Sequence, residues 1–293
     1  APGTYEARVS EWRGNALQGQ VQVQALPLLA PVGAIAPNGR PQVVQAPAGD
    51  SRRAASAELT LEIAQAGSYR IDVTSAADAG RITIDGRSGN VGVTGTYGVL
   101  IQGTITSVSG DISINGVGGD TIGAGSVDTL GVFLSAASAS IASTGGAPNA
   151  ASITITATAG NVTSSQAASY GLLNGGSIST VDGPISVTGV SGNTTGVGTS
   201  GNLISVGVMI FGTGTIASSG TGANAGSMTL LGTSGNTNVG SAQGFRQDGA
   251  LSTIDGDISI TGISSTCVDG CFGVSSRANI SATGDGNVAI TGT

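Results

Sequence analysis

Short stretches in which apolar and small polar residues alternate recur along most of the chain, separated by Gly, Asn and Asp. SITITATAGNV (152–162) and GDISITG (256–262) show the pattern most clearly. Successive side chains of an extended strand point to opposite faces, so Ile would face a dry interior while Ser or Thr faces water. We therefore predict many short β-strands, each with one buried face.

These stretches repeat at a fixed spacing. GDISING, GPISVTG and GDISITG begin at residues 110, 183 and 256, each 73 residues after the one before. Gly98, Gly171 and Gly244 follow the same two steps. A second family of similar strings lies between these copies, which halves the period to about 36 residues, and such self-similarity indicates stacked structural repeats.

Each unit contains three strand candidates, the first of which directly follows a Gly. The fold class that we predict is all-β, a right-handed parallel β-helix (a solenoid) with three short strands per coil. Equivalent apolar residues would then stack into core columns at ~4.8 Å per coil. The column of the second strand is predicted to be Ile105, Ile141, Ile178, Ile216, Leu251 and Ile280. The column of the third strand is predicted to be Ile112, Ile153, Ile185, Met228, Ile258 and Val288.

Residues 1–80 differ in composition and in sequence pattern from the repeat array of residues 81–293. We predict that they form a β-rich domain or a cap, because terminal units of solenoids cover edge strands and are usually atypical. The Pro-rich segment 27–47 is predicted to be irregular. ELTLEI (58–63) and YRIDV (69–73) alternate with period two and are predicted to pair as a hairpin.

Composition argues against catalysis and against several partners. Charged residues make up 9% of the chain, and Lys and His are absent. The chain therefore lacks the commonest general base, the commonest metal ligand and any Schiff-base lysine. The formal net charge of −7 argues against nucleic acid or an anionic membrane as partner. We predict that the protein is not an enzyme and that it does not insert into a membrane.

The two cysteines, Cys267 and Cys271, lie in the string CVDGC. Their spacing allows a small disulfide-closed loop, which would fit an oxidising compartment, and two free thiols are the alternative. A zinc site would need more ligands than the chain offers. We predict no cofactor, with calcium as an alternative because GGDTIGAGSVD (118–128) faintly resembles a calcium-binding repeat.

Two columns of acidic residues are candidate catalytic positions. Asp111 and Asp257 are in register, and Asp182 and Asp255 form a second column. Carbohydrate-active β-helices need clustered acids, usually with a basic partner. Residues 88–293 offer only Arg246 and Arg277 as cations, and Asp at such corners commonly caps a turn. We therefore favour capping and assign no catalytic or metal-binding residue.

Two kinds of surface could contact a ligand. Tyr97 and Tyr170 occupy equivalent corners and could stack on sugars, or they could pack beneath a loop. The outward residues of the third strands form ladders of Ser and Thr that resemble ice-binding surfaces. Ser and Thr are also ordinary exposed strand residues, so carbohydrate binding or degradation is the first alternative function and ice binding a weaker one.

The iterated strings GDISITG, SITITATAGNV and YGVLIQGTITS, together with the scarcity of charge, resemble the repeats of filamentous haemagglutinin-like bacterial exoproteins. These are secreted by two-partner or autotransporter routes. The resemblance implies an extracellular or cell-surface location and a structural or adhesive role as a rigid rod or filament. Expected partners are further copies joined end to end, or a glycan or protein on a host or neighbouring cell.

Overall fold

The computed structural model is all-β. It describes residues 81–90, 95–123, 128–147, 150–164, 166–196 and 203–293 in full, and the backbone of the strands within residues 3–80. Apart from one short 3-10 helix at Gly222–Asn224, every regular element in this part of the chain is a strand. The predicted all-β class is confirmed.

Two nine-stranded sheets form most of the molecule. Sheet I contains, from one edge to the other, β27 (Val288–Gly292), β24 (Ile258–Ile263), β21 (Met228–Thr233), β17 (Ile185–Val190), β13 (Ile153–Thr158), β9 (Ile112–Val117), β6 (Gly80–Arg87), β1 (Gly3–Glu11) and β4 (Ala55–Ile63). Sheet II contains β26 (Ile280–Ala282), β23 (Ala250–Thr253), β20 (Thr215–Ser218), β16 (Ser177–Thr180), β12 (Ser140–Ser143), β8 (Thr104–Ser107), β5 (Ser68–Ser75), β2 (Leu17–Leu26) and β3 (Gln42–Ala46).

Two smaller sheets complete the structure. Sheet III contains β25 (Phe272–Ser276), β22 (Gly240–Gln247), β19 (Leu203–Ile210), β15 (Ala168–Asn174), β11 (Thr129–Leu134) and β7 (Thr96–Ile101). Sheet IV contains β10 (Thr121–Ile122), β14 (Val162–Ser164) and β18 (Thr194–Gly196).

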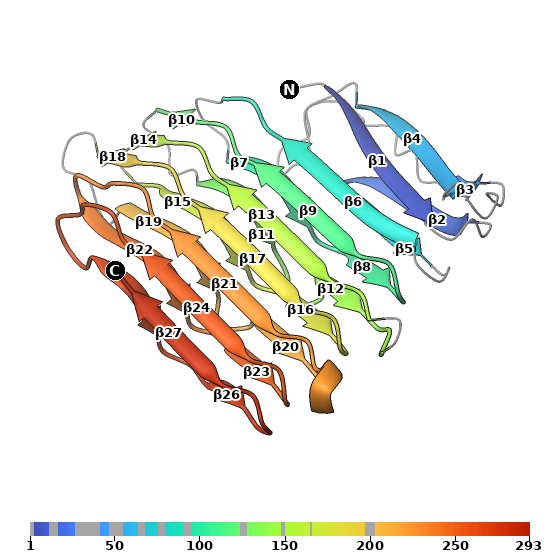
Figure 1. Cartoon of the computed structure of the whole chain (residues 1–293). Coiled ribbons are helices and arrows are strands. Elements are labelled where there is room, and N and C mark those ends of the chain that lie inside the picture. The colour runs from blue at the N-terminus through green and yellow to red at the C-terminus, as the bar shows by residue number, and fades with distance from the viewer. Residues whose placement is uncertain are drawn as a thin grey trace.

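From β7 onward the chain visits the sheets in a constant order, first III, then II, then I, with sheet IV following in three of the repeats. All strand pairs in this part are parallel, so each strand lies beside its equivalent in the next repeat (Figure 1). Parallel strands in several stacked sheets are the pattern of a β-helix or solenoid. The predicted parallel β architecture is therefore confirmed.

Strands β1–β4 have antiparallel partners only, whereas β5 is antiparallel to β2 on one side and parallel to β8 on the other. β4 lies antiparallel to β1, and β5 lies antiparallel to β2, so the predicted hairpin of 58–63 with 69–73 is wrong. The two strands lie in different sheets because each finds a better partner far away in the sequence than across the four-residue connection. Within the Pro-rich segment, Gln42–Ala46 forms β3 at the edge of sheet II, so the prediction of irregular structure is wrong there; residues 27–41 lie outside the described part.

The interior consists of aliphatic side chains stacked along the axis. Ile105 is in register with Ile141, and the pairing continues through the other residues of the second-strand column to Ile280. The third-strand column is likewise in register from Ile112 to Val288. Val288 departs from the predicted burial, with 43% exposure, because β27 has a strand neighbour on one side only.

Glycine columns bring sheets I and III into close contact. One column in sheet I, which starts at Gly86 and Gly116, is glycine in every described coil except at Ala157. A Cβ at Gly207, in the facing column of sheet III, would meet the carbonyl oxygen of Gly244 at 2.6 Å and the carbonyl carbon of Gly232 at 2.7 Å. These glycines are required by close backbone approach, since positive φ among the described glycines occurs only at Gly123, Gly222, Gly240 and Gly270.

Candidate functional site

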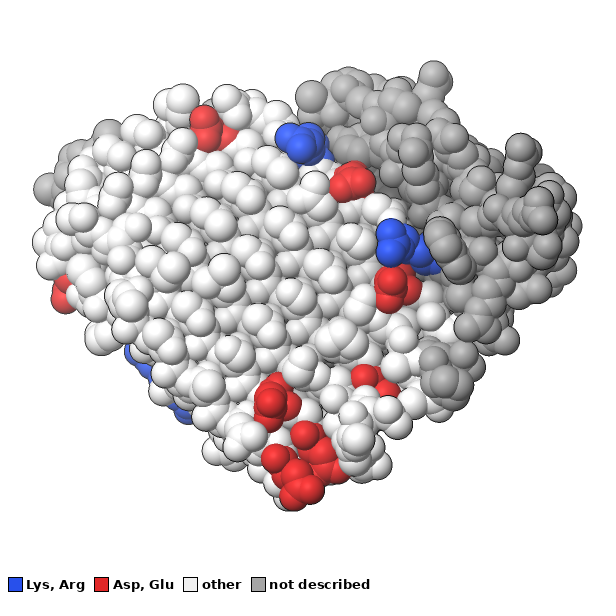
Figure 2. All heavy atoms as spheres, viewed as in Figure 1, with Lys and Arg blue, Asp and Glu red and all other residues white. Residues whose placement is uncertain are grey.

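The outer face of sheet I is a broad surface almost without charge. Strands β9, β13, β17, β21, β24 and β27 contain no charged residue. Figure 2 shows this face in white, with charged side chains gathered at its margins. Ser, Thr and a few Asn, Leu and Ala point outward. Among these strands, only β13 presents Thr at both central outward positions, Thr154 and Thr156.

The two predicted contact tyrosines lie on the outer face of sheet III. Tyr97 and Tyr170 are both in register with Leu130, which lies between them. Tyr97 is 36% exposed and stacks on Phe133, with ring centroids 5.9 Å apart. Burial, followed by the charge of Asp128, raises the pKa of Tyr170 to about 12. Tyr97 is therefore the more accessible of the two rings, and its aromatic partner is Phe133 of the next coil.

The carboxylates of the two predicted acidic columns accept backbone hydrogen bonds from a neighbouring coil, which is the following coil for Asp111 and Asp257 and the preceding coil for Asp182. Asp111 accepts from the Ser152 N–H at 2.9 Å and from its hydroxyl at 2.7 Å. Asp257 accepts from the Asn287 N–H at 2.7 Å, and Asp182 accepts from the Ala147 N–H at 2.6 Å. In the described structure these groups tie one corner to the next, as expected for capping.

Asp111 gives a test of this capping role. Burial raises the pKa of the Asp111 carboxyl, but hydrogen bonds from Ser152 and the nearby Arg81 outweigh it and leave the pKa lowered. The ionised form is thus stabilised by folding, so its contribution is complete above the unfolded pKa of about 3.9 and is lost as pH falls through the folded value.

We expect Asp111→Asn to lower the free energy of unfolding at pH 7 by no more than about 1 kcal/mol, because the carboxylate is partly exposed and screened. Urea unfolding should show this difference shrinking below about pH 4. Asp285→Asn is a matched control, since its carboxylate makes no hydrogen bond or ion pair within the described residues. A pH-independent difference for Asp111→Asn would contradict the capping role.

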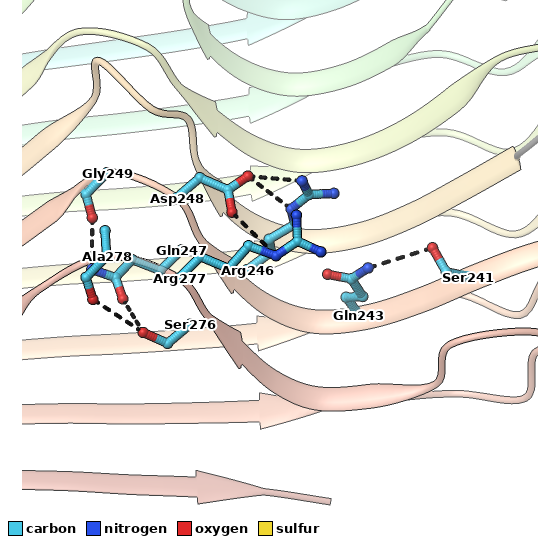
Figure 3. Close-up of polar contacts among 9 residues, drawn as sticks. All are labelled: Ser241, Gln243, Arg246, Gln247, Asp248, Gly249, Ser276, Arg277 and Ala278. Atoms are coloured by element: carbon cyan, nitrogen blue, oxygen red, sulfur yellow. Dashed lines mark hydrogen bonds and ion pairs between the residues drawn. The ribbon is translucent and has the colours of Figure 1, made fainter.

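The only two cations of residues 88–293, Arg246 and Arg277, are held by one acid (Figure 3). Asp248 accepts from Arg246 Nε at 3.0 Å, and Arg246 Nη2 lies 2.8 Å from the same carboxylate oxygen. Arg277 Nε lies 3.9 Å from the other oxygen. Arg246 and Asp248 are each about four-fifths buried, with 19% and 18% side-chain exposure. The arginines are thus engaged in an intramolecular cluster.

A ladder of polar side chains, missed at the level of sequence, runs along the corner that follows each sheet I strand. The side-chain oxygen of every member but the last accepts from the backbone N–H of the equivalent residue in the next coil, at 2.7–3.1 Å, and the last member takes part only through its N–H. We call it the corner ladder, and its members are Asn90, Asp120, Asn161, Asn193, Asn236 and Thr266. A Gly followed by Asn or Asp in successive units is the signal that could have found it.

The corner ladder ends at an open groove of about 620 Å³. Three successive coils line this corner groove with residues 193–195, 236–238 and 266–268. Its walls consist of Asn and Thr side chains, together with Cys267 and Val268, and contain no charged residue. The structure places neither Tyr97 nor Tyr170 among the lining residues.

The predicted disulfide closes one wall of the corner groove. Cys267 and Cys271 are bonded, with Cα atoms 5.8 Å apart. Sheet IV stops before this point, where only the bridge Thr194–Thr237 continues it. The short disulfide-closed loop therefore lies at the last of the three coils that line the groove.

The two acidic residues of segment 118–128 lie at different corners and accept hydrogen bonds from different backbone groups. Asp120 belongs to the corner ladder, and Asp128 accepts from the Ala168 N–H at 2.8 Å; residues 124–127 lie outside the described part. Across the described residues, no three His, Cys, Asp or Glu side chains gather as metal ligands would. In the same part of the chain, no helix has the length and apolar character needed to cross a membrane.

Comparison with known proteins gives no assignment. No family model matches the sequence, and neither a curated protein nor a solved structure matches it significantly. The resemblance to filamentous haemagglutinin-like repeats therefore stays an expectation from the sequence, and a functional argument must start from the coil architecture and the corner groove.

Proposed function

We propose that this chain is a structural or adhesive protein of the cell exterior, built as a right-handed parallel β-helix with three main strands per coil. Its mechanical role is to act as a rigid rod that holds surface loops at a distance or that assembles into a filament. The right hand follows from the general handedness of parallel crossover connections.

The observation that carries this proposal is the unbroken register of the coils. Six strands stack in sheet III, and the aliphatic columns of sheets I and II continue through the same coils. Backbone hydrogen bonds join every coil to the next, and side-chain ladders add further bonds at the corners. Such a body resists bending because each coil is fixed by backbone bonds on both sides.

Self-association is the second part of the proposal. In the described structure, β25, β26 and β27 each have a strand partner on one side only. Ile290, in β27, is 49% exposed. Unpaired strand edges with apolar side chains readily accept further strands, so we propose that this edge takes up strands of a second copy.

Electron microscopy of the purified chain at rising concentration tests this proposal. We expect rods of constant width that lengthen into filaments, because each added copy restores backbone pairing at the edge. An Ile290→Lys variant, which places a charge on the edge strand, should stay as single rods. Globular particles of irregular width would contradict the rod, whereas single rods at all concentrations would contradict only the assembly.

The same electron microscopy is carried out with and without calcium. Filaments that form equally with and without calcium are the expected result, since the acids of the predicted columns and of segment 118–128 hold backbone N–H groups. Assembly only with calcium would favour the calcium-binding alternative instead.

The alternative functions find less support in the described structure. Carbohydrate degradation would need a pair of acids free for catalysis, and the four acids of the predicted columns all accept backbone bonds. Ice binding would be favoured by a uniform lattice of Thr, and the outer face of sheet I mixes Thr with Ser, Asn, Leu and Ala. Carbohydrate binding without cleavage is compatible with the adhesive role.

A further inference from the structure

The amide groups of the corner groove are oriented by the corner ladder. Asn193 Oδ1 accepts from the Asn236 N–H at 2.8 Å, and Asn236 Oδ1 accepts from the Thr266 N–H at 3.1 Å. Asn238 Oδ1 accepts from the Gly196 N–H at 2.7 Å. A backbone N–H can only donate, so each Oδ1 must face it, and each NH₂ group is turned away from that bond.

These NH₂ groups are donors without an acceptor among the described residues. Earlier in the ladder the situation differs, because the Asn161 side-chain NH₂ donates to Asp120. All three residues are exposed, so their NH₂ groups are open to solvent or to a ligand where Asn193, Asn236 and Asn238 line the groove. The groove therefore presents amide donors beside apolar surface.

An apolar residue borders the same donors. Val268, which is 71% exposed, adds an apolar surface at the rim.

Charge decides the class of ligand. An anion would meet a chain of net charge −7 and no cationic side chain in the groove. A metal cation would need several oxygen ligands, commonly with carboxylates among them, but no carboxylate lines the groove and each amide oxygen already accepts one backbone N–H. A neutral ligand rich in oxygen acceptors, with apolar C–H faces, satisfies both the donors and Val268.

We propose that the corner groove binds a neutral saccharide through the amide groups of Asn193, Asn236 and Asn238. Saccharide hydroxyl and ring oxygens accept from the amides, and the C–H face of a sugar ring packs on Val268. This inference deepens the adhesive role proposed above by naming the class of surface ligand and the position of the site on the rod.

The Asn236→Asp variant tests how much an amide donor contributes to ligand binding. Asp120 already occupies the corner ladder and accepts the same kind of backbone bond, so the substitution keeps the ladder while removing the NH₂ group. Asn279→Asp adds the same charge at an exposed position outside the groove and is the matched control. Thr195→Val removes an exposed groove hydroxyl with little change of volume and serves as a second variant.

Titration calorimetry with cellohexaose, maltohexaose and chitohexaose, with an oligogalacturonate as charged probe, tests the proposal. We expect at least one neutral hexaose to bind and the oligogalacturonate not to bind. Asn236→Asp should weaken binding by about fivefold or more, as expected for one lost hydrogen bond, while Asn279→Asp binds like the unmodified chain and thermal melting stays unchanged.

Absence of binding by all neutral probes would overturn the proposal, as would unchanged binding by both Asn236→Asp and Thr195→Val. Either result leaves the rod untouched if electron microscopy still shows rods of constant width. If Asn236→Asp lowers the melting temperature, the binding affinity of Thr195→Val alone tests the proposal. The Thr195 side chain takes no part in the ladder.

Discussion

An Ile258→Asp substitution is expected to unravel the coils around β24. The Ile258 side chain is fully buried, in register with Met228 on one side and Val288 on the other. A carboxylate there would have no hydrogen-bond donor in the aliphatic column. Burying an unpaired charge costs several kcal/mol, so we expect the free energy of unfolding to fall by at least about 3 kcal/mol.

Thermal melting and limited proteolysis measure this effect, with new cleavage sites expected in residues 250–293. Ser259→Asp is the matched control, because Ser259 adjoins Ile258 on the same strand but lies on the opposite, solvent-facing side. Its melting temperature should stay close to that of the unmodified chain. Equal melting and equal protease resistance for the two variants would show that the Ile column is not a dry interior.

A Gly207→Ala substitution is expected to push sheets I and III apart. The added methyl would meet backbone atoms of Thr233, Gly232 and Gly244 at distances that real Cβ atoms essentially never show. Backbone atoms held in two parallel sheets cannot give way without moving whole strands. We expect a loss of about 1–3 kcal/mol or more in the free energy of unfolding.

Gly212→Ala provides the control, since a Cβ at Gly212 would have no heavy atom within 4 Å. Its effect should stay within about 0.5 kcal/mol. Urea unfolding of both variants makes the comparison. If Gly207→Ala were as stable as Gly212→Ala, the glycine columns would be a matter of composition and not of close sheet packing.

Much of the strand register follows from local pattern. Alternation of Ile with Ser or Thr assigns a buried face to each strand, and the recurring steps align Ile112 with Ile153 and Ile105 with Ile141, as the structure has them. The CVDGC spacing likewise predicted the Cys267–Cys271 bond. These features depend on period-two geometry and short covalent reach, both of which can be read along the chain.

Pairing between distant segments could not be read in the same way. Alternation in 58–63 and 69–73 predicts two strands but not their partners, and β4 and β5 lie in different sheets. The role of Gly207 was also hidden, since the facing glycines belong to strands that only the closed coil brings together. In both cases the decisive contact joins residues with no local relation.

The sequence by itself determined the all-β class, the repeat and the buried face of its strands, because these depend on side-chain alternation at fixed spacing. The tertiary structure alone decided how the corners are used. Asn193, Asn236 and Thr266 meet in one ladder only after three coils are stacked. The corner groove likewise combines residues of three coils with a disulfide-closed loop at its end, and the shape of such a space depends on backbone paths that residue patterns do not encode.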